Sequence, residues 1–361
     1  MSFYDALLGF DFERPYSLSA AEKRTRVLPL LLELGDIHAS RCREYQSIIR
    51  SLSFSGSPSC IEDIPFIPVR LFKHMDLLSV PRESVFKTLT SSGTSGSVPS
   101  RVFLDRENAA MQSKVLGSTV TSFLGNHRLP MLVVDAEDVL KNRASFSARG
   151  AGVVGFSLYG RGMRYALDSS MVLKLDEVRA FALKHGDEGV FLFGFTFVVW
   201  KHLYRQLRDA GEHLDFGERS ILIHGGGWKK LVDESVSPAE FKARLAETAG
   251  IRRVHSYYGM VEQTGSIFME CERGRLHASD FCDVVVRDPI SFKPCEIGQE
   301  GVVQVISLLP LSYPGHSLLT EDLGTLLGED NCPCGRLGRY FSVSGRMKAS
   351  EIRGCSDVRQ L

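Results

Sequence analysis

Residues 90–101 are the part of the sequence whose side chains are best suited to hold a phosphate chain, and they read T-S-S-G-T-S-G-S-V-P-S-R. Glycine lets backbone N–H groups approach phosphate oxygens, and each hydroxyl can donate one more hydrogen bond. No Gly-Lys-Ser/Thr follows, so this is not a Walker P-loop. A flexible Gly/Ser linker is the alternative, although linkers rarely lie between apolar runs in mid-chain. The candidate phosphate-binding residues are Ser91, Ser92, Gly93, Thr94, Ser95 and Gly96.

Three later stretches carry side chains that complement such a loop. Residues 257–262 (Y-Y-G-M-V-E) follow an expected strand and place an aromatic ring and a carboxylate at the carboxyl edge of a sheet, where ligands of α/β proteins bind. Residues 320–324 offer Asp322 for sugar hydroxyls, and residues 345–348 offer Arg346 and Lys348 for anions. Taken singly, these residues could equally be core aromatics, a turn aspartate and surface cations.

The order and type of these motifs resemble the adenylate-forming superfamily of acyl-CoA synthetases and related ligases. T-S-S-G-T-S-G is similar to its phosphate loop, and residues 225–227 to its adenine-side glycine turn. Residues 258–262 resemble its Y-G-x-T-E motif, residues 320–324 its T-G-D element and residues 345–348 its hinge G-R-x-K.

One branch of the superfamily is a still better match, the LuxE-type acyl-protein synthetases. The residues behind this resemblance are 258–263 (Y-G-M-V-E-Q), 312–316 (S-Y-P-G-H), 332–336 (C-P-C-G-R) and the ending 352–357 (I-R-G-C-S-D), and it extends from about Pro65 to the end of the chain. It implies that ATP activates a carboxylic acid of the fatty-acid class as an acyl-adenylate. The acyl group would then pass to Cys355 and on to a partner protein such as an acyl reductase.

The resemblance also implies roles for particular residues. Glu262 would hold Mg²⁺, Arg346 would assist catalysis, Asp322 would bind the ribose, and Lys348 would contact the nucleotide. The remaining nucleotide-binding residues, besides those of the phosphate loop, would be Gly225, Gly226, Gly227, Tyr258, Gly259 and Thr264.

Several positions depart from the superfamily pattern. Ser100 and Arg101 stand where the loop usually closes with lysine, and Arg101 is the candidate to replace it. Val261 replaces a threonine, for which Thr264 could substitute, and Glu321 replaces the glycine of T-G-D. The usual C-terminal lid domain and its catalytic lysine are not recognisable, which is itself a feature of the LuxE branch. Two alternatives therefore stay open: a ligase that passes the acyl group to an external thiol such as CoA or a carrier protein, and a non-catalytic nucleotide-binding subunit.

Cys332 and Cys334 form a C-x-C pair that could bind structural zinc. Two further ligands would have to come from Cys271, His277, Cys282 or Cys295. The spacing is not that of a known zinc finger, so a tight turn with buried thiols is the favoured interpretation.

Composition limits the other classes of function. The 361 residues carry 43 Lys+Arg and 43 Asp+Glu, so no global attraction to nucleic acid or anionic membrane is expected. No apolar run is long enough to span a bilayer, and no signal peptide is recognised. The eight cysteines have no framework spacing, which favours reduced thiols in a cytoplasm.

The elements that must position these residues follow from periodicity and caps. Ser19 and Glu22 form a capping box for a helix in which Pro29 is expected to cause a later start or a bend. Strands at 129–134, 190–195, 220–224 and 254–258 alternate with helices, which indicates a mainly parallel α/β sheet. Residues 150–155 match G-x-G-x-x-G, but we interpret them as a core strand and not as a dinucleotide site.

The expected fold class is α/β, the large domain of the adenylate-forming enzymes with a smaller β-rich subdomain and without the lid domain. The expected division is an N-terminal helical region (1–80), an α/β adenylation core (81–281), a β-rich subdomain (282–345) and a C-terminal tail with the acceptor cysteine (346–361).

Overall fold

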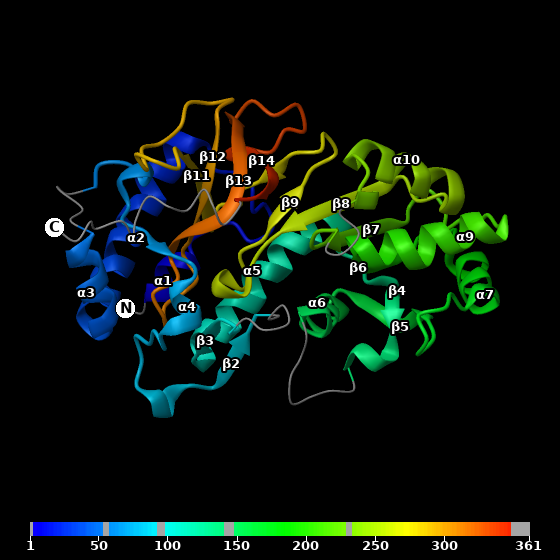
Figure 1. Cartoon of the computed structure of the whole chain (residues 1–361), viewed down its shortest axis with the longest axis horizontal. Helices are drawn as coiled ribbons and strands as arrows, with labels where there is room; N and C mark the ends of the chain where they lie inside the picture. The colour runs from blue at the N-terminus through cyan, green and yellow to red at the C-terminus, as the bar shows by residue number, and fades with distance from the viewer. Residues whose placement is uncertain (1–2, 53–57, 92–97, 141–147, 229–232, 348–361) are drawn as a thin grey trace. The chain divides into compact units, whose positions relative to one another are not determined.

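The computed structural model describes residues 3–52, 58–91, 98–140, 148–228 and 233–347 (Figure 1). By their contacts the residues divide into two compact units. The first unit comprises Met1–Thr119, Gly259–Phe268 and Arg275–Leu361. The second unit comprises Val120–Tyr258 and Met269–Gly274.

The strands of the first unit are mostly antiparallel. β11 (Cys282–Arg287), β12 (Glu300–Ser307), β13 (Ser317–Glu329) and β14 (Arg339–Arg346) pair in chain order, and β10 (Leu276–His277) pairs with β14. β1 (Ile67–Pro68) pairs parallel to β13, while β2 (Lys87–Thr90) and β3 (Arg101–Leu104) form a separate hairpin. This unit confirms the expected β-rich texture of the last third of the chain.

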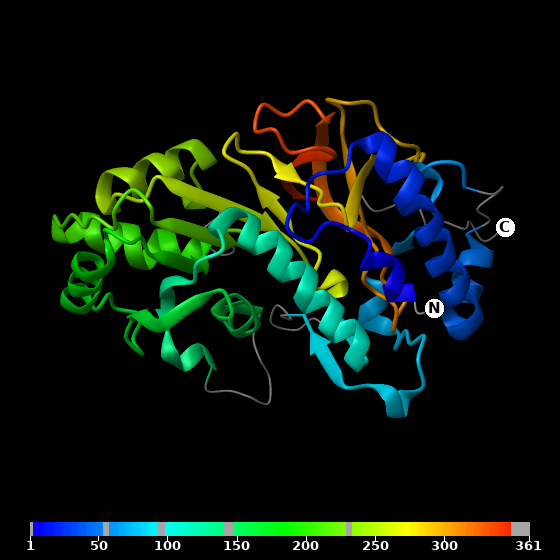
Figure 2. The same cartoon turned by 180° about the vertical axis from the view of Figure 1, so that it is seen from behind.

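Helices accompany these strands on the first unit. They are α1 (Phe3–Leu7), α2 (Ala20–Arg41), α3 (Arg43–Ser51), α4 (Leu71–His74) and most of α5 (Arg106–Leu124). Figure 2 shows α1 and α2 lying along the antiparallel strands. Of the helices in the described part of the chain, none combines the length and the apolar composition needed to cross a bilayer.

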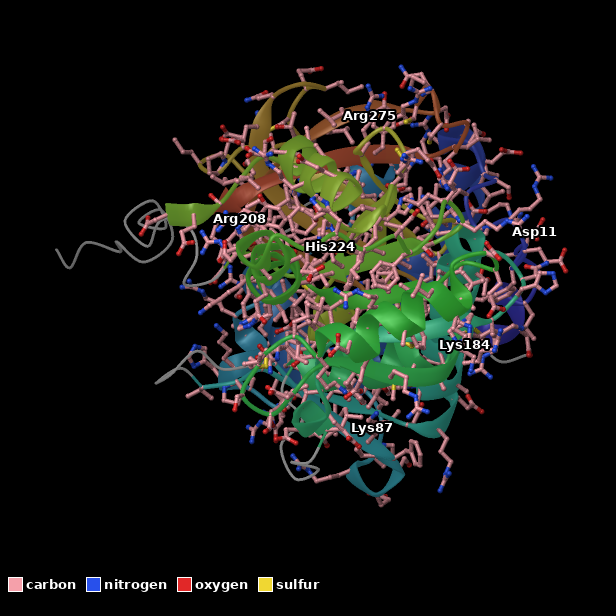
Figure 3. All side chains as sticks on the ribbon, turned by 90° about the vertical axis from the view of Figure 1, so that its right-hand side faces the viewer. Asp11, Lys87, Lys184, Arg208, His224 and Arg275 are labelled. Carbon is pink, nitrogen blue, oxygen red and sulfur yellow. The ribbon has the colours of Figure 1, made fainter. Side chains whose placement is uncertain are left out.

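The second unit has the parallel sheet that the sequence predicts. β5 (Gly160–Leu167), β4 (Leu129–Ala136), β6 (Phe191–Phe195), β7 (Ile221–Gly225) and β8 (Arg253–Tyr258) pair parallel in that order. The short β9 (Phe268–Glu270) follows β8 in the chain. The helices are α6 (Ala148–Ser157), α7 (Leu175–His185), α8 (Thr196–Val198), a π-helical turn (Val199–Tyr204), α9 (Arg205–Ala210) and α10 (Pro238–Ala249). His224 of β7 is buried, whereas Lys184 and Arg208 on the helices are exposed (Figure 3).

The predicted helix caps are present. Ser19 Oγ accepts a hydrogen bond from the Glu22 amide, and the Glu22 carboxylate accepts one from the Ser19 amide at 2.8 Å, so the capping box is complete. The later helix start expected from Pro29 is wrong, because α2 begins at Ala20 and continues through Pro29 to Arg41.

The prediction of a core strand at residues 150–155 is also wrong, because these residues lie in α6. A Cβ added at Gly152 would lie 3.1 Å from the Phe195 ring and 3.3 Å from the Phe193 ring. Glycine at this position therefore lets the helix pack close to β6. A short apolar run does not reveal from its periodicity whether it is a buried helix or a buried strand.

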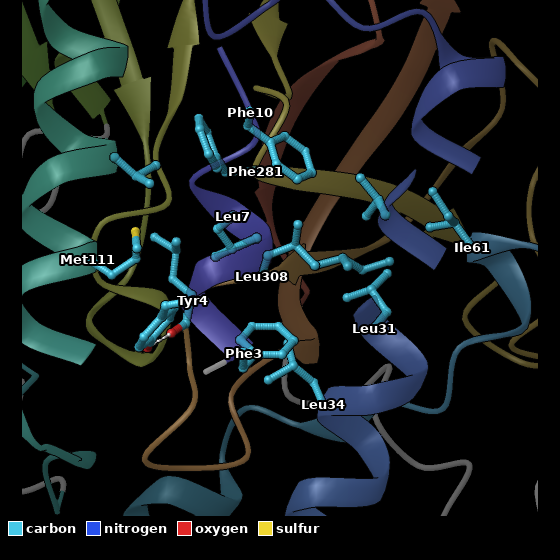
Figure 4. Packing of buried hydrophobic residues seen from close by; sticks show 14 of the residues in the cluster. Phe3, Tyr4, Leu7, Phe10, Leu31, Leu34, Ile61, Met111, Phe281 and Leu308 are labelled. Carbon is cyan, nitrogen blue, oxygen red and sulfur yellow. Dashed lines mark hydrogen bonds between the residues drawn. The ribbon is translucent and has the colours of Figure 1, made fainter. Parts of the chain in front are cut away.

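A hydrophobic core joins the N-terminal helices to the antiparallel strands of the first unit (Figure 4). Leu7 of α1, Leu31 of α2, Met111 of α5 and Leu308 after β12 all belong to it. The Tyr4 hydroxyl donates a hydrogen bond to the Leu309 carbonyl at 2.7 Å, which satisfies its polar atom in this core. The N-terminal residues are thus an integral part of the first unit.

Candidate active site

The hairpin of β2 and β3 flanks the residues that are expected to form a phosphate loop. The Ser91 amide donates to the Ser100 carbonyl at 3.0 Å, and the Ser100 amide donates to Ser91 Oγ at 2.8 Å. These two bonds close the base of the loop directly beyond the paired strands. Its tip, which includes Ser92, Gly93, Thr94, Ser95 and Gly96, lies outside the described residues.

Glu262 lies in a 3₁₀ turn, Val261–Gln263, whose backbone is held from the S-Y-P-G-H segment. The Tyr313 hydroxyl donates to the Glu262 carbonyl at 3.0 Å. Gln263 Nε2 donates to the carbonyl of Gly315 at 2.8 Å and to that of Val305 at 3.1 Å. The turn is therefore fixed on both sides of the carboxylate.

The Glu262 side chain is only 6% exposed. Burial raises the pKa of its carboxyl group, and the nearby Ser100 hydroxyl and the charges of Lys73 and Arg346 lower it only in part. The carboxylate thus lies beside the base of the loop with its negative charge incompletely balanced. An oxygen ligand in that situation fits a small hard cation such as Mg²⁺.

Asp322 and Arg346 face each other on the neighbouring strands β13 and β14. They are register partners, and Arg346 Nε lies 3.3 Å from Asp322 Oδ1. Asp322 is 17% exposed and Arg346 is 75% exposed, so the pair itself adds little to stability. Lys348 lies outside the described residues.

Arg101, the candidate to replace the loop lysine, forms an ion pair with an aspartate. Its guanidinium lies 2.7 Å from Asp76 Oδ1, and Asp76 also pairs with Arg82 at 2.8 Å. Glu321, which replaces glycine in the T-G-D element, forms a 2.5 Å ion pair with Arg70.

The residues expected to frame an adenine lie on the second unit, at the carboxyl ends of the adjacent parallel strands β7 and β8. Gly225 is the register partner of Tyr257, and a Cβ at Gly225 would overlap the Tyr257 ring. Gly226 has a φ of 73°, and its carbonyl accepts a hydrogen bond from Thr196 Oγ1 at 2.7 Å. A Cβ at Gly227 would meet nothing within 4 Å. The sheet therefore has residues 225–227, at the end of β7, and Tyr258, at the end of β8, along the same edge.

Gly259 and Thr264 belong to the first unit and lie on either side of Glu262 in sequence. A Cβ at Gly259 would lie 3.0 Å from Ile267 Cγ2, so a side chain at this position would be tightly packed. Thr264 Oγ1 donates to the Val261 carbonyl at 2.8 Å and so closes the turn that carries Glu262.

Within the first unit, Ser91 thus bonds to Ser100 at the loop base, Asp322 pairs with Arg346, and the charge of Arg346 acts on the Glu262 carboxyl group. Sequence reasoning did not single out Lys73 of the four-residue helix α4, because an isolated lysine in a short helix carries no motif. It also did not assign Tyr313 and Gly315 to the support of Glu262. Their place in S-Y-P-G-H was a usable signal.

Comparison with known proteins identifies first the fold and then the family. The fold matches a crystal structure of 2-hydroxyisobutyryl-CoA ligase in complex with 2-HIB-AMP and CoA. The TM-score is 0.66 at 18% identity, over 92% of this chain and 76% of that one. The expected fold of the adenylate-forming ligases is thereby confirmed.

The family described as acyl-protein synthetase, LuxE, matches residues 5–360, and this chain belongs to it. Two relatives are named long-chain-fatty-acid–luciferin-component ligase. The one from Aliivibrio fischeri is 23% identical over 95% of this chain and 90% of its own length. The one from Vibrio harveyi is 24% identical over 95% and 89%. The chain is therefore an acid–thiol ligase of the acyl-protein synthetase type.

Proposed function

We propose that this enzyme uses ATP to convert a fatty acid to its acyl-adenylate and then transfers the acyl group to its own Cys355 as a thioester. The observation that carries the proposal is the buried Glu262 carboxylate beside the closed base of the Ser91–Ser100 loop, with Arg346 close enough to affect its pKa. Fatty acids are the class of substrate because two relatives of similar length are named for them.

In the first step, a carboxylate oxygen of the acid attacks the α-phosphorus of ATP, and pyrophosphate leaves. Ser91, Ser92, Thr94 and Ser95 donate hydrogen bonds to phosphate oxygens, while Gly93 and Gly96 allow backbone approach. Glu262 would hold Mg²⁺, which when bound supplies positive charge against the leaving pyrophosphate. The work of the protein is positioning and charge neutralisation.

The remaining nucleotide contacts are those that the resemblance of the motifs implies. Gly225, Gly226, Gly227 and Tyr258 would frame the adenine, with Gly259 and Thr264 shaping the turn that follows. Asp322 would accept hydrogen bonds from the ribose hydroxyls, and its partner Arg346 would hold it in place. Arg346 and Lys348 would also contact the phosphates.

In the second step, the Cys355 thiolate attacks the acyl carbonyl carbon, and AMP leaves. Cys355 lies outside the described residues. Its sequence neighbours include Arg353 and Arg359, and cations favour the nucleophilic thiolate. The thioester would then be passed to an acyl-accepting partner protein, for which an acyl reductase is the chemical expectation.

The test of the adenylation step is ATP–pyrophosphate exchange with a panel of fatty acids. Glu262→Gln is expected to lower the exchange rate on the order of 10²-fold or more, because charge neutralisation is lost. Its melting temperature should not fall, because burial disfavours the charged carboxylate in the free protein. Glu83→Gln, at an exposed glutamate, is the matched control and should exchange normally. Wild-type exchange in Glu262→Gln would remove this residue from the mechanism, and absence of exchange with every acid would remove the function.

A further inference from the structure

A second group of reactive side chains lies in the first unit and takes no part in the proposed chemistry. His277 of β10 and Cys332 and Cys334 of the β13–β14 connection have ligand atoms that all lie within 4.8 Å of one another. Cys334 Sγ is 3.4 Å from His277 Nε2. His277 and Cys332 are buried and Cys334 is half-buried, so the cluster is largely shielded from solvent.

The separations fit the dimensions of a tetrahedral zinc site. With Zn–S near 2.3 Å and Zn–N near 2.0 Å, neighbouring ligand atoms lie roughly 3.5 to 3.8 Å apart. The 3.4 Å contact already has that length, and the others need to shorten by about 1 Å at most to reach it. Two thiolates and an imidazole are soft to borderline ligands, which select zinc over magnesium or calcium.

The surroundings are suited to thiolates bound to a metal. Arg275 Nη1 lies 3.8 Å from Cys332 Sγ, and its guanidinium stacks over the Tyr340 ring at 5.0 Å. The same ring stacks on His277, with centroids 5.4 Å apart. A cation therefore faces one sulfur while an aromatic partner fixes the imidazole plane, as groups around a bound metal commonly do.

The backbone presents the two cysteines on a tight turn. The Gly335 amide donates to the Cys332 carbonyl at 3.0 Å, and Gly335 has a φ of 83°. The Gly338 amide closes the loop by donating to Asp330 Oδ1 at 2.7 Å. The loop thus has a defined shape that holds both thiols toward β10.

We propose that His277, Cys332 and Cys334 bind one structural zinc ion, with Cys271 as the fourth ligand. Cys271 is buried and lies six positions before His277 in the sequence. A closed set of four protein ligands leaves no position for substrate, so the ion would stabilise the fold. It would tie the β13–β14 connection to β10, which pairs with β14.

The experiment is elemental analysis and native mass spectrometry of the full chain, purified without a polyhistidine tag. We expect about one zinc ion per chain in the wild type. Cys332→Ser, Cys334→Ser, His277→Ala and Cys271→Ser should each lose bound zinc. Cys295→Ser is the matched control, because Cys295 is half-buried and lies outside the cluster, and it should keep its zinc. Retention of zinc by Cys271→Ser would remove Cys271 from the ligand set.

Because a variant that loses the metal can also fail to fold, the wild type supplies a second measurement. A chelator should lower its melting temperature, and zinc alone should restore it. Replacement by Co²⁺ should give the intense visible absorption of tetrahedral cobalt with sulfur ligands. The proposal would be overturned if the chain is isolated without metal and its melting temperature changes with neither chelator nor zinc. It would also be overturned if the chain holds a stoichiometric metal other than zinc. Neither result bears on adenylation, which is followed by pyrophosphate exchange.

Discussion

A substitution at Gly315 should shift the position of Glu262 while leaving its carboxylate chemically unchanged. A Cβ at Gly315 would lie 2.8 Å from the Glu262 carbonyl oxygen and would also overlap the Tyr313 ring. Gly315 is buried, and its own carbonyl accepts the hydrogen bond from Gln263. In Gly315→Ala, the turn that carries Glu262 must therefore shift to make room for the methyl group.

The size of the effect follows from the packing. Relieving the 2.8 Å contact to an ordinary van der Waals separation requires a shift of roughly half an ångström or more, and overpacking of this kind costs about 1–3 kcal/mol. Misplacing a catalytic group by about 1 Å can cost on the order of 10²-fold in rate. We expect Gly315→Ala to unfold at lower urea and to exchange pyrophosphate about 10- to 100-fold more slowly.

The assay pairs urea unfolding with ATP–pyrophosphate exchange at saturating ATP. Gly35→Ala is the control, because a Cβ there meets only His316 Nε2 at 4.0 Å in the middle of α2. That substitution should raise stability by about 0.5–1 kcal/mol and leave exchange unchanged. If Gly315→Ala loses stability but exchanges at the wild-type rate, the position of Glu262 does not limit the reaction.

Three further predictions concern the nucleotide site and the response to acid. Asp322→Asn should raise the KM for ATP about tenfold with little change in kcat, because charge-assisted hydrogen bonds to the ribose weaken; steady-state kinetics measures this. Gly225→Ala should lower the unfolding free energy by about 1–3 kcal/mol and weaken ATP binding in calorimetry, because its methyl group overlaps the Tyr257 ring. Burial lowers the pKa of His224 from its usual 6.5 to about 3 and that of His316 to about 4, so the unfolded chain binds more protons than the folded one below pH 6.5. Stability should therefore be complete above that pH and fall toward pH 4 in thermal melts, more steeply in the wild type than in His316→Gln.

Local signals in the sequence predicted most of the secondary structure. Ser19 and Glu22 form the predicted capping box at the start of α2. Caps and strand runs depend on neighbours in sequence, so one chain is enough to find them. The strand prediction for residues 150–155 was wrong because the deciding contact, with Phe195 of β6, is not local in sequence.

The candidate site shows the same limit. Motifs pointed to Glu262, and the structure adds what no motif encodes: its burial, the nearby Ser100 hydroxyl and the charge of Lys73. The proposed zinc cluster was harder still, since His277 and Cys334 lie 57 positions apart and meet only after β10 pairs with β14. Pairings over such distances depend on the register of the strands.

The most direct test of the acyl-protein mechanism is the intact mass of the chain after incubation with Mg²⁺, ATP and a fatty acid that supports pyrophosphate exchange. The wild type should gain the mass of one acyl group, and hydroxylamine should remove it as expected for a thioester. Cys355→Ser should keep exchange and show no adduct. An adduct that persists in Cys355→Ser, or a wild type that exchanges with an acid but never becomes acylated, would contradict acyl transfer to Cys355 and favour a ligase that passes the acyl group to an external thiol.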